Sequence, residues 1–288
     1  MIPGQARNGE VTLAYERTGP AGGEPMLLIM GLGMQMLLWP DEFCAELADH
    51  GFAVARFDNR DVGASTHVRH AGMPSLLGIL TRPAAVAPYR LTDMADDAVA
   101  VLDALDWPSA HVVGASLGGM IAQTMAIRHP GRVRSLTSIM STPSPRIGRP
   151  RLDVLAVLAG REVDSPDGAG DRLVRVFRAI GSPAYPHNEQ WLREVGRQAY
   201  LRGHDPAGTR RQLAAIAASG DRRTGLARLR MPILVLHGDA DPLVRPSGGR
   251  ATAAAVPGSR LVMYPGMGHD LPRALWSEFA AQIRSIAK

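Results

Sequence analysis

The chain has 288 residues, of which 45% are hydrophobic and 20% are charged, as in an ordinary globular protein. Its formal charge is +5, but Lys288 is the only lysine, so 31 of the 32 basic residues are arginines, and they are scattered among 27 acidic residues. Nucleic-acid binding needs basic residues gathered into a run or a patch. We therefore expect no nucleic-acid partner.

Cysteine content and hydropathy restrict the class further. Cys44 is the only cysteine, which excludes a disulfide within the chain, and it is expected to be a small buried core residue. The first seven residues lack the charged and apolar regions of a secretion signal. The most apolar window, 26–39, contains two glycines and a glutamine and is shorter than the roughly 20 residues of a membrane-spanning helix. We expect a cytoplasmic protein without a membrane span, and the sequence predicts no oligomeric state.

Strands and helices alternate along both ends of the chain. Apolar runs and period-two patterns predict strands, and apolar residues at three- and four-residue spacing predict helices. The segment 65–91 contains three prolines and is expected to be irregular, and Thr92 is the expected N-cap of the helix after it. The predicted strands are residues 11–15, 26–30, 52–57, 111–113, 133–140, 233–237 and 260–264, and the predicted helices are residues 41–50, 93–105, 117–129, 247–256 and 275–287.

Between residues 142 and 230 this alternation stops. Helical patterns follow one another there, and the alternation of strands and helices resumes afterwards. We interpret 142–230 as a helical cap inserted into an α/β core that consists of residues 1–141 and 231–288; a separate helical domain is the alternative. For the core, the alternation predicts a mostly parallel sheet of the eight-stranded type with helices on both faces. The helical patterns of the cap are at 152–158, 173–180, 191–201 and 207–218.

The segment from Gly114 to Gly118 carries the first candidate catalytic residue. It has the pattern G-x-S-x-G around Ser116, after the apolar run of a predicted strand and before a predicted helix. A serine on such a sharp turn has a strained backbone, and the glycines two residues away lack the Cβ atoms that would keep strand and helix apart. The pattern is typical of a nucleophile elbow, and Ser116 is the predicted nucleophile.

A serine hydroxyl needs a general base and a carboxylate that orients the base. His269 is the predicted base, because it is the one histidine of nine that lies in a glycine-rich loop directly after the final strand. The acid is Asp239 or Asp241, both just after the strand at 233–237, and we favour Asp241. Asp239 is expected to bond to the turn backbone instead. Serine, aspartate and histidine then follow one another in the order typical of this kind of site.

Carbonyl attack by the serine creates an oxyanion that needs two backbone donors. The N–H of Leu117, at the start of the helix after the elbow, is one predicted donor, because the helix dipole adds favourable charge there. The other is the N–H of Leu32, in the loop after the strand at 26–30. A simple strand-to-helix turn is the alternative interpretation of that loop.

Several methionines and aromatic residues are candidates for an apolar substrate pocket. Methionine fills irregular apolar space and adapts to varied ligands, but ordinary core packing would produce the same pattern. The cap residues Phe177, Trp191 and Tyr200 leave the same two possibilities open. The candidate substrate-binding residues are Met34, Trp39, Met140 and Met267.

Six stretches of the sequence resemble the α/β-hydrolase superfamily, in order along nearly the whole chain. The chain is similar in particular to a branch of actinobacterial serine esterases of the aclacinomycin methylesterase type. The resemblance implies an enzyme of the α/β-hydrolase fold with a serine, histidine and aspartate triad and without a metal or an organic cofactor. The stretches are MG-x-G at 30–33, WPDEF at 39–43, RFDNRDVGAST at 56–66, HVVGASLG at 111–118, GDADPLV at 238–244 and PGMGH at 265–269.

Two positions depart from the family pattern. Met30 stands where many relatives carry a histidine before the oxyanion glycine. The loop after the strand at 52–57 has D-N-R-D-x-G instead of the commoner D-x-R-G-x-G. Asp58, Arg60 and Asp61 of this loop are expected to brace the loop and not to take part in catalysis.

The leading hypothesis is a carboxylic ester hydrolase that forms an acyl-enzyme on Ser116 and acts on apolar small-molecule esters. The resemblance suggests methyl esters of bulky polyketides, and short-chain esters are equally open. A lactonase, a carbon–carbon bond hydrolase or a perhydrolase would use the same triad. A ligand-binding receptor on this fold is the non-catalytic alternative. Serine at the elbow argues against the epoxide hydrolases and haloalkane dehalogenases, which carry aspartate there.

Overall fold

The computed structural model describes residues 1–158, 160 and 163–287. Its strands are β1 (Ile2–Asn8), β2 (Val11–Thr18), β3 (Glu24–Ile29), β4 (Phe52–Phe57), β5 (Ala110–Ala115), β6 (Val133–Ile139), β7 (Ile233–Gly238) and β8 (Arg260–Tyr264). They form one eight-stranded sheet in the order β1-β2-β4-β3-β5-β6-β7-β8. β2 is antiparallel to both of its neighbours, and the remaining pairs are parallel. The predicted mostly parallel sheet is therefore confirmed.

Helices connect most of the strands, as strand–helix–strand units require. In chain order they are α1 (Asp41–Asp49), α2 (Leu76–Thr81), α3 (Pro83–Val86), α4 (Leu91–Ala104), α5 (Leu117–Arg128), α6 (Leu152–Leu158), α7 (Pro166–Ile180), α8 (Glu189–Arg202), α9 (Pro206–Ala218), α10 (Arg223–Leu226), α11 (Ser247–Ala255) and α12 (Trp276–Ile286). Within the described ranges, none of them has both the length and the apolar character needed to cross a membrane.

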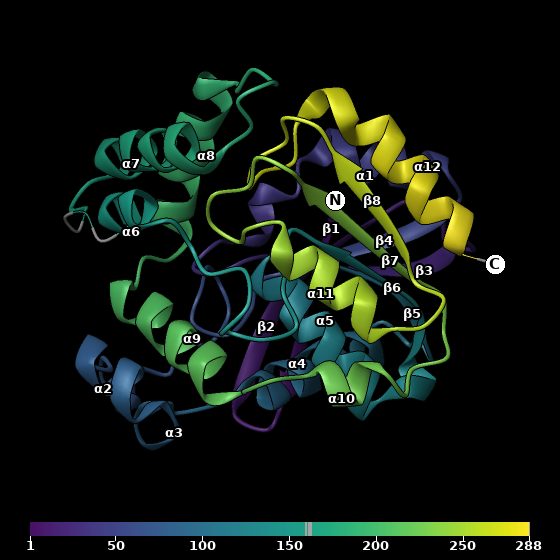
Figure 1. Ribbon diagram of the computed structural model, residues 1–288, viewed down its shortest axis with the longest axis horizontal. Helices are drawn as coiled ribbons and strands as arrows, with labels where there is room; N and C mark the ends of the chain where they lie inside the picture. The colour runs from purple at the N-terminus through teal and green to yellow at the C-terminus, as the bar shows by residue number, and fades with distance from the viewer. Residues whose placement is uncertain (159, 161–162, 288) are drawn as a thin grey trace.

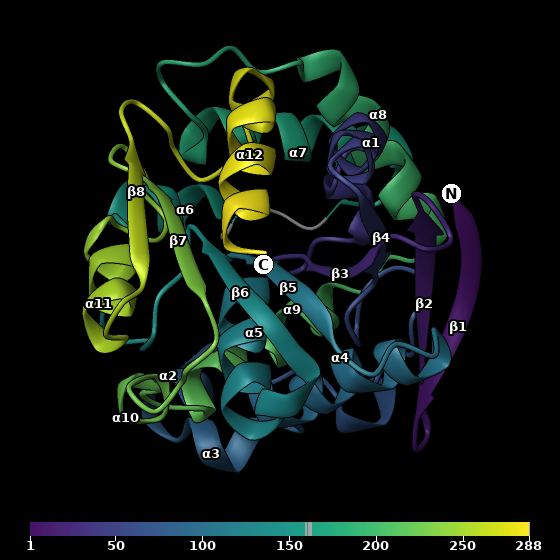
Figure 2. The same cartoon turned by 90° about the vertical axis from the view of Figure 1, so that its right-hand side faces the viewer.

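The sheet lies between two hydrophobic layers, because successive side chains of a strand point to opposite faces. In β3, Leu27 and Ile29 pack in the core formed with α4 and α5, whereas Met26 and Leu28 pack in the core formed with α1 and α12. Figure 2 shows these two pairs of helices on opposite sides of the sheet. All four β3 side chains are fully buried, which explains the uninterrupted apolar run in the sequence.

The N-terminal part differs from the sequence prediction at three places. The sequence predicts no strand at β1, where only Ala6 is buried; this strand exists through its antiparallel ladder with β2. The segment 65–91, expected to be irregular, contains the short helices α2 and α3. Helix α4 starts at Leu91, and the N–H of Arg90 donates to the Asp93 carboxylate at 2.7 Å. Thr92 lies inside this helix, so the predicted capping role of Thr92 is wrong.

Helices α6 to α10 lie between β6 and β7 in the sequence. α6, α7 and α8 sit together at one side of the molecule, away from the sheet, and α9 packs against α2 and α3 (Figure 1). α7 and α8 approach closely because two glycines face one another: a Cβ atom on Gly196 would lie 2.7 Å from the Cα of Gly170. Larger residues at these positions would push the two helices apart.

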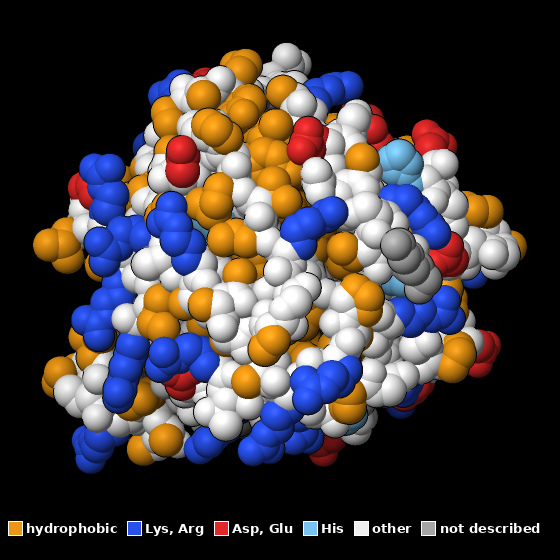
Figure 3. All heavy atoms as spheres, turned by 45° about the vertical axis from the view of Figure 1, so that its right-hand side comes forward, with side chains coloured by type: hydrophobic (Ala, Val, Ile, Leu, Met, Phe, Trp, Pro, Cys, Tyr) orange, Lys and Arg blue, Asp and Glu red, His pale blue; other side chains and the backbone are white. Residues whose placement is uncertain are grey.

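Charged and hydrophobic side chains share the surface. On the face drawn in Figure 3, hydrophobic side chains gather in the upper middle, and basic side chains are spread along the left and lower edges. The basic side chains form no single compact patch on that face, in keeping with the scattered arginines of the sequence.

Candidate active site

Ser116 lies on the sharp turn between β5 and α5. Its backbone has φ 56° and ψ −118°, a region that non-glycine residues rarely adopt. The turn is held because the Ser116 N–H donates to the Ile139 carbonyl at 2.9 Å. A Cβ atom on Gly114 would clash with the backbone of Gly118, and one on Gly118 would clash with the carbonyl of Ile29. Both glycines of the predicted elbow are therefore required by close backbone approach.

The loop after β3 lies directly against this serine. A Cβ atom on Gly31 would be 3.3 Å from the Ser116 Cβ and 3.8 Å from its Oγ. Leu117 is the first residue of α5, and the N–H of a first helical residue has no acceptor within its own helix. Leu32 and Leu117, the two predicted oxyanion donors, both line the same cavity as Ser116.

Asp241 is the aspartate that the structure brings to His269. Its Oδ2 lies 2.7 Å from the Nδ1 of His269, and its Oδ1 accepts the N–H groups of Leu243 and Val244 at 2.9 Å each. Asp239 is exposed and accepts the N–H of Gly266 at 2.7 Å, a turn contact of the expected kind. The geometry thus favours Asp241 over Asp239 as the partner of the histidine.

The charge state of Asp241 follows from its surroundings. Burial by itself raises the pKa of this carboxyl, but the nearby His269 and His237 lower it more, to about 2. Hydrogen bonds that stabilise the ionised form act in the same direction. Asp241 is therefore a carboxylate at neutral pH, which is the form that accepts a hydrogen bond from the Nδ1–H of a histidine and holds its ring in place.

The end of α7 and the residues after it hold the histidine loop. The backbone N–H of His269 donates to the Ile180 carbonyl at 2.7 Å, and the N–H of Gly268 donates to the Ser182 Oγ at 2.8 Å. These two bonds connect the loop after β8 to the helical segment between β6 and β7. The position of His269 thus depends on both parts of the chain.

Ser116 and His269 open onto one cavity of about 690 Å³. Its wall is mostly apolar, and α7 and α8 supply Phe177 and Trp191 to it. Met34 and Met140, two of the four candidate substrate-binding residues, also line it. A cavity of this size with few polar groups is typical of a small-molecule site.

The structure corrects the expectation for Trp39 and Met267, which lie in the core and not on the cavity wall. Trp39 is fully buried and stacks on Phe43 with ring centroids 6.0 Å apart. Met267 is also fully buried, and its carbonyl accepts the N–H of Ala240 at 3.1 Å. Tyr200 also lies outside the cavity wall, and its ring stacks on that of His204. Apolar character predicts burial for such residues but not the side on which they are buried.

The sequence interpretation missed a polar pair on the same wall. Asp270 and His187 both line the cavity, with the Nδ1 of His187 3.3 Å from the Oδ2 of Asp270. Ser182 donates a short hydrogen bond to the same carboxyl. Burial raises the pKa of Asp270 although Ser182 and His187 act in the opposite direction. The only local signal was that Asp270 directly follows His269.

The loop after β4 is braced by its charged residues, as expected. Asp58 accepts the N–H groups of Met36 at 2.8 Å and Ala64 at 3.1 Å. Arg60 forms a two-point contact with Asp97, with distances of 2.6 and 2.7 Å. These bonds tie the loop to its neighbours through well-satisfied charged groups.

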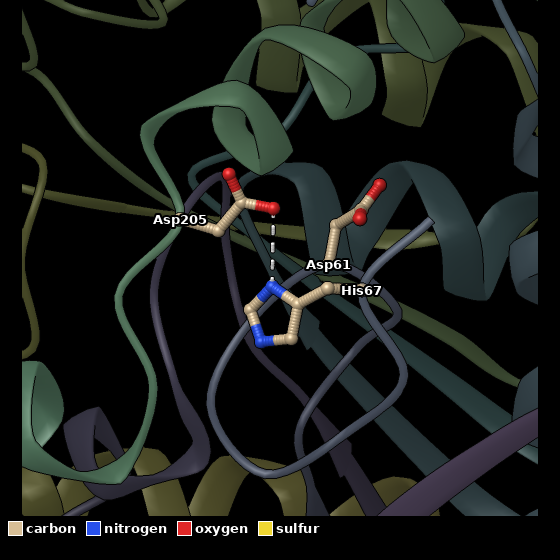
Figure 4. A group of neighbouring side chains, drawn as sticks. All are labelled: Asp61, His67 and Asp205. Carbon is tan, nitrogen blue, oxygen red and sulfur yellow. Dashed lines mark ion pairs between the residues drawn. The ribbon is translucent and has the colours of Figure 1, made fainter. Parts of the chain in front are cut away.

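The structure also brings together Asp61, His67 and Asp205, whose donor atoms lie within 4.8 Å of one another. The sequence shows no such cluster. In Figure 4 the Asp205 carboxylate faces the His67 ring, whereas the Asp61 carboxylate is turned away from that ring. The guanidinium of Arg211 donates to Asp61 at 2.7 and 2.9 Å and to Asp205 at 2.6 Å. These carboxylates therefore already have a cationic partner, and the group is a structural ion cluster.

Fold and site together define the class. The α/β hydrolase fold family model matches residues 24–272, and the chain belongs to this family, as the resemblance implied.

Two similar relatives are both rhodomycin D methylesterases. DauP from Streptomyces sp. (strain C5) is 32% identical in an alignment that covers 95% of this chain and 94% of that protein. DnrP from Streptomyces peucetius is 31% identical in an alignment that covers 96% of this chain and 95% of that protein.

Solved structures support the fold. The esterase RhEst1 from Rhodococcus sp. ECU1013 has a TM-score of 0.76 at 22% identity and covers 99% of this chain and 100% of that chain. The enol-lactonase from Burkholderia xenovorans LB400 has a TM-score of 0.75 at 20% identity and covers 98% and 99%. At these identities the similarity concerns the fold alone.

Proposed function

We propose that the protein is a carboxylic ester hydrolase that works through an acyl-enzyme on Ser116. The observation that carries the proposal is the pair of Asp241 and His269, joined at 2.7 Å, which shares one apolar cavity with a serine on a strained elbow. Strain at a buried turn is characteristic of sites where the backbone is held for function. The methylesterase relatives support ester hydrolysis as the reaction.

In the proposed acylation, Ser116 Oγ bonds to the ester carbonyl carbon, and its proton passes to His269. Because Nδ1 of His269 faces Asp241, Nε2 is the nitrogen that takes the proton. The carbonyl electrons move onto the oxygen, and the N–H groups of Leu32 and Leu117 bind this oxyanion. The C–O bond then breaks, and the alcohol leaves with the proton from Nε2.

Deacylation repeats these steps with water. His269 takes a proton from a water molecule, whose oxygen bonds to the acyl carbon, and the same two N–H groups bind the second oxyanion. Collapse of this second tetrahedral intermediate releases the carboxylic acid, and Ser116 recovers its proton from His269. The ionised Asp241 stabilises the imidazolium that forms in both halves of the reaction.

We propose an apolar small-molecule ester, with methyl esters of bulky acids as the leading class. The volume and the apolar wall of the cavity support a substrate larger than a short-chain ester. The proposed role of residues 142–230 is a cap over this cavity, because Phe177 and Trp191 of that range line its wall. The two rhodomycin D methylesterases support the methyl ester.

The proposal is tested by Ser116→Ala on a panel of esters. The panel contains 4-nitrophenyl esters of increasing acyl length and methyl esters of bulky aromatic acids. We expect hydrolysis by the wild type and a loss of at least about 10³-fold in kcat for the variant. Unchanged hydrolysis by Ser116→Ala would refute the proposal.

Covalent labelling with a fluorophosphonate separates catalysis from ligand binding. The label should attach to Ser116 in the wild type and be absent from Ser116→Ala. If the wild type were labelled but hydrolysed no ester of the panel, a non-catalytic ligand-binding role would be favoured instead.

A further inference from the structure

Helix α9 is hydrogen-bonded to the loop that carries Leu32 through the side chain of Gln212. The N–H of Gly33 donates to Gln212 Oε1 at 2.8 Å, and Gln212 Nε2 donates to the Arg60 carbonyl at 2.8 Å. One partner is a donor and the other an acceptor, so only one orientation of the amide satisfies both. Gln212 is also fully buried. Through its two hydrogen bonds, its amide joins the loops after β3 and β4 to α9.

The same loop is enclosed between α9 and the elbow. Gly33 has φ 66°, and a Cβ atom there would lie 2.6 Å from Thr209 Oγ1 of α9. On the other side, Gly31 lies against Ser116, as described above. The peptide between Leu32 and Gly33 thus has α9 on one side and the nucleophile on the other. A shift of α9 would be transmitted directly to this peptide.

The ion cluster around Arg211 fixes α9 in place. Arg211 precedes Gln212 in the sequence and is 1% exposed. Burial alone lowers the pKa of the Arg211 guanidinium, but Asp61 and Asp205 raise it above its usual value, so the group stays charged. Breaking a buried pair of this kind leaves an uncompensated charge and is strongly unfavourable. Asp61 occupies, with φ 72°, the position where the commoner family pattern has glycine.

We propose that Gln212 is a positioning residue for the oxyanion hole: by holding Gly33, its amide orients the loop so that the N–H of Leu32 faces the reacting carbonyl at Ser116. The inference rests on the proposed function, since it needs a hydrolytic Ser116. Gln212 acts through the backbone and touches no substrate atom. Its effect belongs to the transition state, where the oxyanion develops, and not to substrate binding.

The test compares Gln212→Met with Gln198→Met. Methionine keeps the length of the side chain and removes both hydrogen bonds. Gln198 is an exposed glutamine of α8 that bonds to Glu194 at 2.9 Å, which makes it a matched control. With 4-nitrophenyl butyrate we expect Gln212→Met to lower kcat by about 10- to 100-fold and to change KM by less than about threefold. Gln198→Met should keep wild-type kcat.

An alkyl trifluoromethyl ketone supplies a second measurement, because it forms a tetrahedral adduct with a catalytic serine. Its inhibition constant should rise in Gln212→Met by the same factor by which kcat falls. Wild-type kcat and inhibition in a folded Gln212→Met would overturn the inference while leaving the proposed function intact. Hydrolysis that persists in Ser116→Ala would instead overturn the proposed function.

If Gln212→Met does not fold, Gln212→Glu decides the question. The ionised carboxylate can accept from Gly33 but cannot donate to the Arg60 carbonyl, whereas the protonated carboxyl can do both. The ratio of variant to wild-type kcat should therefore rise as the pH is lowered. A ratio that stays close to one even at a pH at which the carboxyl is ionised would overturn the positioning role.

Discussion

Replacing Asp241 by asparagine turns one carboxylate oxygen into an NH₂ group, and the surrounding hydrogen bonds decide which one. Oδ1 accepts two backbone N–H groups, from Leu243 and Val244, and an NH₂ group there would face two donors. The asparagine oxygen therefore takes this position. Its NH₂ group then replaces Oδ2, the atom 2.7 Å from His269 Nδ1.

An NH₂ group opposite Nδ1 makes that nitrogen an acceptor. The proton of the neutral imidazole then lies on Nε2, the nitrogen that must take the proton of Ser116. The imidazolium also loses its counter-charge. A wrong tautomer of this kind costs about 10⁴ in kcat in a serine-protease triad. We expect a loss on the order of 10³ to 10⁴ for Asp241→Asn, which corresponds to about 4 to 5.5 kcal/mol of transition-state stabilisation.

The assay measures kcat on the best ester of the panel at neutral pH, with the melting temperature as a check on folding. Asp239→Asn is the matched control. Asp239 is exposed and accepts the N–H of Gly266, and asparagine keeps an acceptor there, so kcat should stay within about threefold of the wild type. If Asp239→Asn abolished turnover while Asp241→Asn kept most of it, the assignment would be reversed and the reasoning refuted.

Three further outcomes are expected. Burial raises the pKa of Asp241 and its two histidine neighbours lower it, from an ordinary 3.8 to about 2. The ionised Asp241 therefore contributes about 2 kcal/mol to the free energy of unfolding above about pH 4, and this contribution is lost as the pH falls towards 2. In urea unfolding, Asp241→Asn should lack this acid dependence, and the same pH dependence in variant and wild type would contradict the prediction. Gly118→Ala should lower the free energy of unfolding by about 3 kcal/mol, because the added Cβ atom meets a backbone carbonyl of β3. In the control Gly131→Ala, the added Cβ atom has nothing within 4 Å, so the free energy of unfolding should change by less than about 0.5 kcal/mol. Equal losses of stability in the two variants would be inconsistent with the tight elbow. Burial raises the pKa of the Cys44 thiol to about 12, so iodoacetamide at about pH 8 should label Cys44 only after unfolding in guanidinium; rapid labelling of the native protein would show that the thiol is accessible.

The elbow could be predicted from sequence because it depends on a few consecutive residues. Only glycine fits at 114 and 118 once strand and helix meet at Ser116. The places of Asp241 and His269 could be predicted as well, because each follows the carboxyl end of a strand in a parallel part of the sheet. Parallel pairing then brings the two loops to the same edge.

Other features depend on contacts between distant parts of the chain. Trp39 and Met267 are apolar and buried, but they lie in loops, where no strand or helix period tells a core side from a cavity side. The bonds between Asp61 and Arg211 join residues 150 positions apart, and nothing local to either residue signals the partner. β1 has little apolar character of its own and exists through pairing with β2.

Exchanging helices between relatives is a direct route to a new substrate preference, and the bonds of α7 and α9 limit what such a chimera can carry. Grafting a foreign segment in place of 142–230 would also remove the Ile180 carbonyl that holds His269 and the Gln212 amide that holds the loop after β3. A donor segment without an arginine to match Asp61 would leave that carboxylate buried without a counter-charge. On the proposals above, a graft of the whole segment therefore changes substrate selectivity and turnover together. A chimera that keeps turnover has its recombination sites inside the segment, so that Ile180 and Gln212 stay in place.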